Sequence, residues 1–189
     1  KYARDFGLGI PTGIDLPGEV RGRLKRPNEF EPTTKTYMAF GYEVSATAMQ
    51  MLCAYAAVAN NGILMQPRIV KAVLNNDGTM LNEIEPQKVR QVIREQTAQQ
   101  LKEMLVGVVE RGTATQASIP GVRIAGKTGT AQQLTNGEYD RKNYTASFIG
   151  FYPADKPRVA MIVMLDRSTQ SIYGGQTAAP IFRRIVQKT

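Results

Sequence analysis

The sequence contains no histidine, and its 189 residues include a single cysteine, Cys53. Without histidine, this chain cannot supply a Ser-His or Cys-His nucleophilic pair or a histidine-ligated metal site. One cysteine excludes an intrachain disulfide and a cysteine cluster, and we expect Cys53 to be a buried packing residue on a helix. Any nucleophilic chemistry must therefore use a lysine or a carboxylate as the proton-transfer group.

Long apolar runs are also missing, because none reaches the roughly 18 to 20 residues that cross a bilayer. No signal peptide is visible, and the chain begins at Lys1 without a methionine. We therefore expect a piece of a longer protein, in which a missing anchor has little meaning. The net charge is +8, but the basic residues are scattered apart from a cluster within residues 21–26. No aromatic platform lies between them, so nucleic acid is not an expected partner, whereas an anionic surface stays open for the cluster.

Periodicity predicts three helices. The first covers residues 47–60 and opens with capping-box spacing between Thr47 and Gln50. The second covers residues 98–111, with the same spacing between Thr97 and Gln100. Its expected apolar stripe consists of Leu101, Met104, Leu105, Val108 and Val109. The third begins near residue 178 and should turn Ile181, Phe182, Ile185 and Val186 to the core.

Other segments have strand or loop character. Glycine and proline punctuate residues 1–35 too often for long elements, and residues 12–19 read as turns packed through Ile14 and Leu16. We expect Glu43 to be an exposed turn residue, with a buried partner for a cation as the alternative. The run Asn75-Asn76-Asp77-Gly78 predicts a hairpin.

The second half of the chain switches to a period of two. It predicts strands at residues 122–131, 145–152 and 159–165, with a turn at residues 135–138. Short connections favour antiparallel neighbours, and the third strand, apolar on both faces, is expected to be central or doubly covered. The fold class is therefore α+β, with an antiparallel sheet flanked by helices.

The most informative stretch is residues 126–130, where Lys127, Thr128 and Thr130 accompany two glycines. Residues 121–128 match the G-x-x-x-x-G-K-[ST] pattern of a P-loop. The context argues against that interpretation, since no helix opens after the lysine. In a strand, Lys127 and Gly129 point to one face and Thr128 and Thr130 to the other. Twist, or a bulge at the glycines, would bring them around one anion, which predicts a carboxylate and oxyanion site on a strand edge.

Lys127-Thr128-Gly129 is similar to the third signature motif of penicillin-binding proteins and serine β-lactamases. Its surroundings make the likeness more specific, and it covers essentially the whole chain. The segments that carry it are residues 6–7, 12–19, 54–56, 59–62, 107–109, 112–114, 125–131, 146–151, 173–175 and 178–180. Together they resemble class B (monofunctional) penicillin-binding proteins, closest to the cell-division and sporulation type. Residues 41–43 and Ala48 depart from the commoner family pattern, with little expected consequence.

The resemblance implies a β-lactamase/transpeptidase-like fold and D,D-transpeptidation of peptidoglycan stem peptides through a serine acyl-enzyme. It makes Lys127 and Thr130 catalytic. It assigns Lys127, Thr128, Gly129 and Thr130 to binding of the D-Ala-D-Ala carboxylate or of a β-lactam. The lysine supplies positive potential and the Thr130 N–H supplies half of the oxyanion hole. No cofactor or metal is implied.

The nucleophile is absent from this chain. None of the five serines starts an S-x-x-K or S-x-N pattern: Ser45, Ser118, Ser147, Ser168 and Ser171. We therefore expect residues 1–189 to be the C-terminal portion of a transpeptidase domain that lacks its N-terminal part and is inactive alone. The resemblance places the parent on the extracytoplasmic face of the bacterial cytoplasmic membrane, anchored by an N-terminal helix, beside division or elongation proteins.

Three alternatives remain open. A β-lactam sensor would use the same site for signalling. A serine β-lactamase shares the fold class, although residues 12–19 and 173–175 argue against it. A P-loop nucleotide-binding protein through residues 121–128 is the third and the least favoured.

Overall fold

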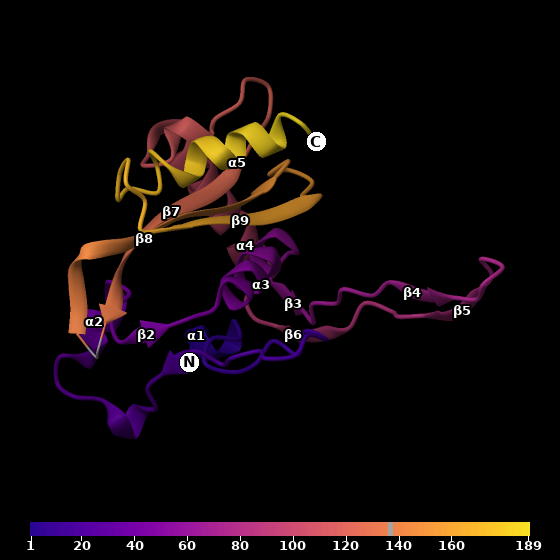
Figure 1. Cartoon of the computed structure of the whole chain (residues 1–189), viewed down its shortest axis with the longest axis horizontal. Helices are drawn as coiled ribbons and strands as arrows, with labels where there is room; N and C mark the ends of the chain where they lie inside the picture. Colours follow the sequence, from indigo (N-terminus) through magenta and orange to yellow (C-terminus); the bar gives the residue numbers. More distant parts are fainter. Residues whose placement is uncertain (136–137) are drawn as a thin grey trace. The chain divides into compact units, whose positions relative to one another are not determined.

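The computed structural model describes residues 1–135 and 138–189, which form two compact units (Figure 1). Unit 1 comprises Lys1–Ala57 and Gly62–Ile93, and unit 2 comprises Val58–Asn61 and Arg94–Thr189. The turn expected at residues 135–138 is centred on Asn136 and Gly137, which lie outside the described residues.

Unit 1 is built from short elements joined by loops, as the glycine and proline content predicts. Its helices are α1 (Tyr2–Asp5), the 3₁₀ turn η1 (Pro27–Glu29), α2 (Thr34–Ala39) and most of α3 (Ala48–Ala59). Its strands are β1 (Arg23–Leu24), β2 (Val44–Ser45), β3 (Ile63–Met65), β4 (Ala72–Leu74), β5 (Met80–Glu83) and β6 (Lys88–Gln91). They pair antiparallel as β1–β2, β3–β6 and β4–β5.

The start of α3 confirms the predicted capping box. The Thr47 hydroxyl accepts the Gln50 N–H at 3.1 Å, and the Gln50 carbonyl oxygen Oε1 accepts the Thr47 N–H at 3.0 Å. The amide of Gln50 also donates to the carbonyls of Ile10 and Arg21, at 2.6 and 2.9 Å. Gln50 is only 1% exposed, so one buried amide ties two loop segments to the helix start.

Carboxylates hold two other loops of unit 1. Glu19 accepts the Thr12 N–H and hydroxyl at 2.7 and 2.5 Å, and the Gly13 N–H at 3.1 Å. Its bond to the Thr12 hydroxyl, more than any other contact, lowers the pKa of Glu19. The expectation that residues 12–19 pack through Leu16 was wrong, because that side chain is half exposed and the carboxylate closes the loop.

Glu43 lies in the expected turn, but its expected exposure was wrong, and the alternative of a cation partner is confirmed. Its carboxylate contacts the Lys25 ammonium at 2.6 Å and accepts the hydroxyl of buried Thr34 at 2.9 Å. The hydrogen bond to Lys25 is the main cause that lowers the pKa of Glu43, and the same bond raises the pKa of Lys25. The sequence pattern missed this pair because its members lie far apart along the chain.

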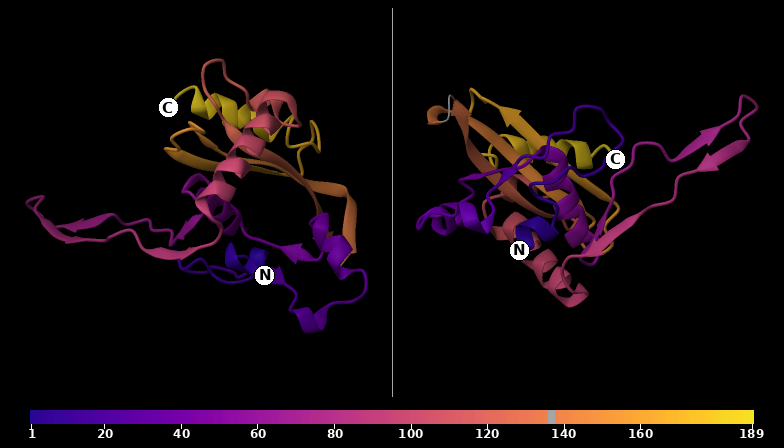
Figure 2. Two further views of the ribbon diagram at one scale, coloured as in Figure 1. Left: turned by 180° about the vertical axis from the view of Figure 1, so that it is seen from behind. Right: turned by 90° about the horizontal axis from the view of Figure 1, so that it is seen from below.

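Strands β4 and β5 form a hairpin ribbon that protrudes beyond β3 and β6 (Figure 2). The predicted turn is confirmed, with the Gly78 N–H donating to the Asn75 carbonyl at 3.0 Å and Gly78 at φ +82°. Cys53, expected to be buried, is partly exposed, and burial is the main cause that raises the pKa of its thiol.

Unit 2 contains a three-stranded antiparallel sheet in the order β7 (Ala125–Thr135), β8 (Glu138–Tyr152), β9 (Val159–Asp166). Its helices are α4 (Glu95–Arg111), the 3₁₀ turn η2 (Thr115–Ala117) and α5 (Ala178–Val186). The α+β class and the antiparallel meander are therefore confirmed. The third strand was expected to be central or doubly covered, and both were wrong for the described part of the chain, where β9 is an edge strand without a fully buried residue.

The core of unit 2 lies between the sheet and α5, which covers one face of the strands (Figure 1). Phe148 of β8 and Phe182 of α5 are fully buried and meet edge to face, with ring centroids 4.7 Å apart. The other buried members are Val109, Ala114, Ala117, Ile124, Ala178, Ala179 and Val186. Phe182 and Val186 confirm the predicted face of the last helix, whereas Ile185 is 41% exposed.

Helix α4 differs from its prediction in two respects. It begins three residues before residue 98, with Arg94 as N-cap and no side-chain capping bond, so the expected Thr97–Gln100 box was wrong. The buried residues of α4 are Ala98, Lys102, Val106 and Val109. Met104, from the expected stripe, is 67% exposed. The prediction failed because it was drawn from apolar residues alone, so it counted Met104 as buried and gave Lys102 no place.

Candidate active site

A cavity of about 470 Å³ in unit 2 brings three separate segments together. Residues 128 and 130 come from β7, residues 113–116 follow α4, and residues 173–176 form the loop before α5. The lining residues are Thr113, Thr115, Gln116, Thr128, Thr130, Tyr173, Gly174, Gly175 and Gln176. The cavity thus contains two of the predicted site residues, Thr128 and Thr130, and its wall is rich in hydroxyl and amide groups.

Strand β7 places these threonines through its pairing with β8. Thr128 lies opposite Phe148, so both side chains share the face that carries the core, and Thr130 follows two residues later. Gly126 is required by this packing, since a Cβ there would lie 2.4 Å from the Phe148 ring. The register is continuous past Gly126 and Gly129 and shifts only between Gln132 and Leu134. The bulge expected at the glycines was therefore wrong.

The strand geometry also removes the P-loop alternative. Residues 125–128 are the start of an eleven-residue strand, and no helix begins after Lys127. The glycine at 126 makes room for a phenylalanine ring, as described above, so its function is core packing. A phosphate cradle at a helix N-terminus is thus contradicted.

The Lys127 side chain starts from the face of β7 opposite to that of Thr128 and Thr130, yet its ammonium reaches Thr128. Its ammonium Nζ lies 3.1 Å from the Thr128 carbonyl oxygen and 3.4 Å from the Thr128 hydroxyl. Lys127 is exposed and is not part of the cavity wall. The long side chain thus brings a positive charge to Thr128 without a register shift of the strand at this point.

Thr113 is a site residue that the sequence analysis did not identify. Its hydroxyl and that of Thr128 lie 2.9 Å apart. The motif Gly112-Thr113-Ala114 was recognised only as part of a family likeness, because nothing in its spacing connects it with residue 128. Contacts between residues fifteen positions apart have no local sequence signal.

The loop before α5 lines the cavity, and its close approach to neighbouring backbone explains why it contains two glycines. A Cβ at Gly174 would lie 2.0 Å from the Ser147 carbonyl oxygen and 2.7 Å from that of Gly129. A Cβ at Gly175 would lie 2.3 Å from the carbonyl oxygen of Thr113. Only glycine permits this approach of backbone to backbone. Two adjacent glycines at 174 and 175 indicate a close approach of backbone to backbone, but the sequence did not show which segment they contact.

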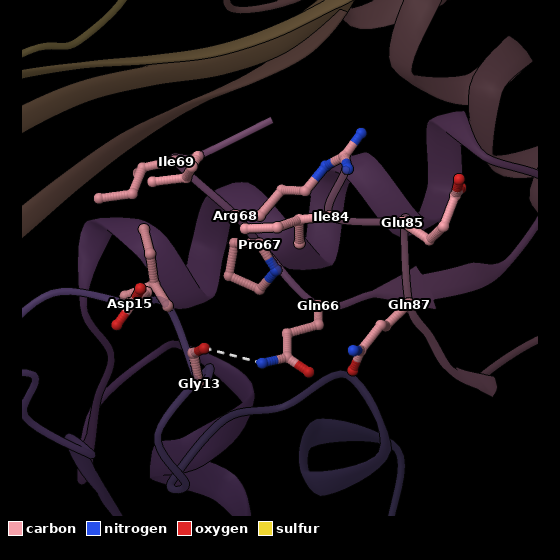
Figure 3. A pocket seen from close by; sticks show the side chains of 11 residues that line it. Gly13, Asp15, Gln66, Pro67, Arg68, Ile69, Ile84, Glu85 and Gln87 are labelled. Atoms are coloured by element: carbon pink, nitrogen blue, oxygen red, sulfur yellow. Dashed lines mark hydrogen bonds between the residues drawn. The ribbon is translucent and has the colours of Figure 1, made fainter. Parts of the chain in front are cut away.

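A second cavity, of about 360 Å³, lies in unit 1 at the base of the hairpin ribbon. The side chain of Gln66 crosses toward residue 13 and donates to the Gly13 carbonyl at 2.9 Å (Figure 3). None of the predicted site residues lines it. Across residues 1–135 and 138–189, no group of three potential metal ligands is found. Within the same described ranges, no helix combines the length and apolar character of a membrane span.

Sequence comparison connects the site with a known family. The profile of the penicillin binding protein transpeptidase domain matches residues 1–187, so the chain belongs to this family. It is 40% identical over 189 residues to stage V sporulation protein D of Bacillus subtilis, covering 99% of this chain and 29% of the relative. It is 31% identical over 187 residues to a protein of Neisseria gonorrhoeae named probable peptidoglycan D,D-transpeptidase PenA, covering 98% of this chain and 30% of that one.

Structural comparison agrees. Penicillin binding protein 3 of Mycobacterium tuberculosis, in complex with aztreonam, superposes with a TM-score of 0.90 at 38% identity. The match covers 99% of this chain and 44% of that one. The transpeptidase-domain fold is therefore confirmed, and the chain spans less than a third of the length of the curated relatives described above.

Proposed function

We propose that this chain forms the carboxylate-binding edge of a peptidoglycan D,D-transpeptidase. The observation that carries the proposal is the cavity lined by Thr128 and Thr130, with the Lys127 ammonium 3.4 Å from the hydroxyl of Thr128. Hydroxyls beside a fixed cation suit a carboxylate such as that of a D-Ala-D-Ala terminus. The name of the Neisseria relative and the aztreonam complex of the Mycobacterium protein support the same substrate class.

The chemistry proposed for the parent protein is acyl transfer through a serine. The serine attacks the D-Ala-D-Ala amide, D-Ala leaves, and the acyl group passes to the amine of a neighbouring stem peptide. β-Lactams acylate the same serine. Lys127 supplies positive potential and assists proton transfer, while the N–H of Thr130 stabilises the oxyanion. One such donor is worth about 3 kcal/mol in the transition state. In the described sheet β7 pairs only with β8, so the backbone groups along its other edge have no partner strand there.

The nucleophile is proposed to lie in another part of a longer parent. No serine of this chain has the S-x-x-K or S-x-N pattern, and the relatives are about three times as long. Strand β9 supports this, because it is rich in apolar residues and yet is an edge strand in the described sheet. Residues 1–189 would then be the C-terminal portion of the domain, completed by a preceding segment. An N-terminal membrane anchor, an extracytoplasmic location and division or elongation partners belong to the same proposal.

Intact-mass spectrometry with ampicillin tests this function. The purified parent should gain the mass of one ampicillin, because ring opening adds the whole molecule to the serine. Peptide mapping should place the adduct outside residues 1–189, and the isolated chain should remain unlabelled. No adduct on the parent would contradict the function. An adduct on the isolated chain would contradict the missing nucleophile, and rapid repeated turnover of ampicillin would identify a β-lactamase instead.

A further inference from the structure

We propose that Thr113 is a positioning residue that commits the Thr128 hydroxyl to donate its hydrogen to a bound carboxylate. The inference rests on the proposed function, and it adds a residue from outside the lysine–threonine strand to the recognition of the donor carboxylate. It begins with the contact of 2.9 Å between the two hydroxyl oxygens. Either oxygen can be the donor in this contact.

Hydrogen-bond counting decides the direction once an anion is bound. A threonine hydroxyl has one hydrogen and two acceptor lone pairs. The Lys127 ammonium has only donors, so at 3.4 Å it occupies one lone pair of Thr128. If Thr113 donates to the second lone pair, the only group that Thr128 has left to offer is its hydrogen. A carboxylate in the cavity accepts that hydrogen, and the chain of hydroxyls strengthens the bond by polarisation.

The backbone around Thr113 holds this hydroxyl in place. The next residue, Ala114, is fully buried in the core, and its N–H donates to the Val108 carbonyl at 3.2 Å. On the preceding side, a Cβ at Gly112 would lie 2.8 Å from the Val108 backbone. Gly175 packs against the carbonyl of Thr113 itself. The side chain of Thr113 is therefore presented from a backbone that is fixed on three sides.

Removal of the Thr113 hydroxyl should weaken the reaction with a negatively charged ligand more than the reaction with a neutral one. In Thr113→Val, the Thr128 oxygen keeps only the ammonium, and a free lone pair can then face the carboxylate. The bond that is weakened runs from the Thr128 hydroxyl to the ligand carboxylate. A hydrogen bond to a charged group is worth more than a neutral one, so its loss should change the acylation rate by roughly tenfold. A ligand without the negative charge gains nothing from an oriented donor, so it should be almost insensitive.

The experiment uses the intact parent and two probes, benzylpenicillin and its neutral methyl ester. Thr113→Val should lower the second-order acylation rate by about tenfold for benzylpenicillin and by less than about twofold for the ester. Thr113→Ser should restore the rate for benzylpenicillin. Thr169→Val, a change at an exposed threonine outside the cavity, should alter neither rate. If the valine variant does not fold, Thr113→Ala gives the same comparison.

Equal losses of acylation rate for both probes in Thr113→Val would show a merely structural role and would overturn the proposal. Unchanged rates in Thr113→Val would overturn it too, as would a benzylpenicillin rate that Thr113→Ser does not restore. Failure of the proposed function has a different signature. In that case the wild-type parent itself takes up neither probe, whatever residue occupies position 113.

Discussion

The two units of this chain are held together by different forces. In unit 1, two of the four buried side chains that are not glycine are polar, Thr34 and Gln50, and each bridges loops through hydrogen bonds. In unit 2, the largest fully buried side chains are Phe148, Phe151, Phe182 and Ile124. Phe148, Phe182 and Ile124 belong to one apolar cluster between the sheet and α5. Hydrogen bonds of buried polar groups therefore hold the loops of unit 1, whereas apolar packing positions the strand of unit 2 that carries Lys127.

The difference has a functional reason. A catalytic constellation must be held to within about 0.5 Å, and rigid elements do this better than loops. Thr128 lies opposite Phe148 on the neighbouring strand, so a fully buried core residue supports the site directly. Disturbance of this core should therefore reach the cavity, whereas disturbance of unit 1 should remain local.

The largest expected effect is that of Phe148→Ala. Removal of a fully buried ring that meets Phe182 should destabilise unit 2 by about 3–5 kcal/mol. Hydrogen exchange measured by mass spectrometry on the intact parent should show lost protection in β7 and β8. Leu134→Ala, at a side chain that is 62% exposed, is the matched control and should change protection by less than about 0.5 kcal/mol. Equal effects of the two variants would refute the assigned core.

Gln50→Leu should have the next largest effect, and in the other unit. It leaves the carbonyls of Ile10 and Arg21 without their donor and the Thr47 N–H without its acceptor. Unpaired buried groups cost about 1–3 kcal/mol each, and partial access of water should limit the total to about 2–3 kcal/mol. Exchange should accelerate around residues 10 and 21, while β7 and β8 keep their protection.

The control for this variant is Gln100→Leu, because Gln100 is an exposed glutamine with the same spacing to a threonine but without a capping bond in α4. It should be close to neutral. Loss of protection spread evenly over both units in Gln50→Leu would contradict the separation drawn above.

The smallest effect concerns pH. The pKa of Glu19 is below its ordinary value of 4.5, chiefly through the Thr12 hydroxyl. A lowered pKa in the folded state means that the carboxylate contributes stability above about pH 4.5, and that this stability is lost as the pH falls through the lower folded value. The amides of Thr12 and Gly13 should therefore exchange faster below that pH, after correction for the intrinsic rate. Glu19→Gln should remove this pH dependence, and a dependence that persists in the variant would assign it to another group.

Local patterns predicted the elements of this fold better than its contacts. The helix at residues 48–59 and its capping box were predicted because the helix, its cap and the cap's partner are neighbours in sequence. The identical spacing at Thr97 and Gln100 failed, since α4 starts earlier and places both residues inside the helix. Strand β9 was expected to be central or doubly covered because it is apolar on both faces, and composition does not tell which part of the chain covers a strand.

For the candidate site too, the residues of one local stretch were predicted and the long-range contacts were not. Lys127, Thr128 and Thr130 were identified from one short stretch, and two of them line the cavity as the strand geometry brings them there. Thr113 and the residue 173–176 loop were not given a role, because they reach the site through long-range packing of glycine against backbone. Such contacts depend on the register of three segments at once, which no local pattern contains.

The central claim is that the exposed ammonium of Lys127 serves the cavity at Thr128. Its most direct test is the rate of acylation of the intact parent by benzylpenicillin in Lys127→Ala, with Lys142→Ala as control for the loss of an exposed lysine elsewhere on the sheet. The account predicts a fall of at least about tenfold for Lys127→Ala with the fold intact, and no change for the control. An unchanged acylation rate in folded Lys127→Ala would remove Lys127 from the site and contradict the account.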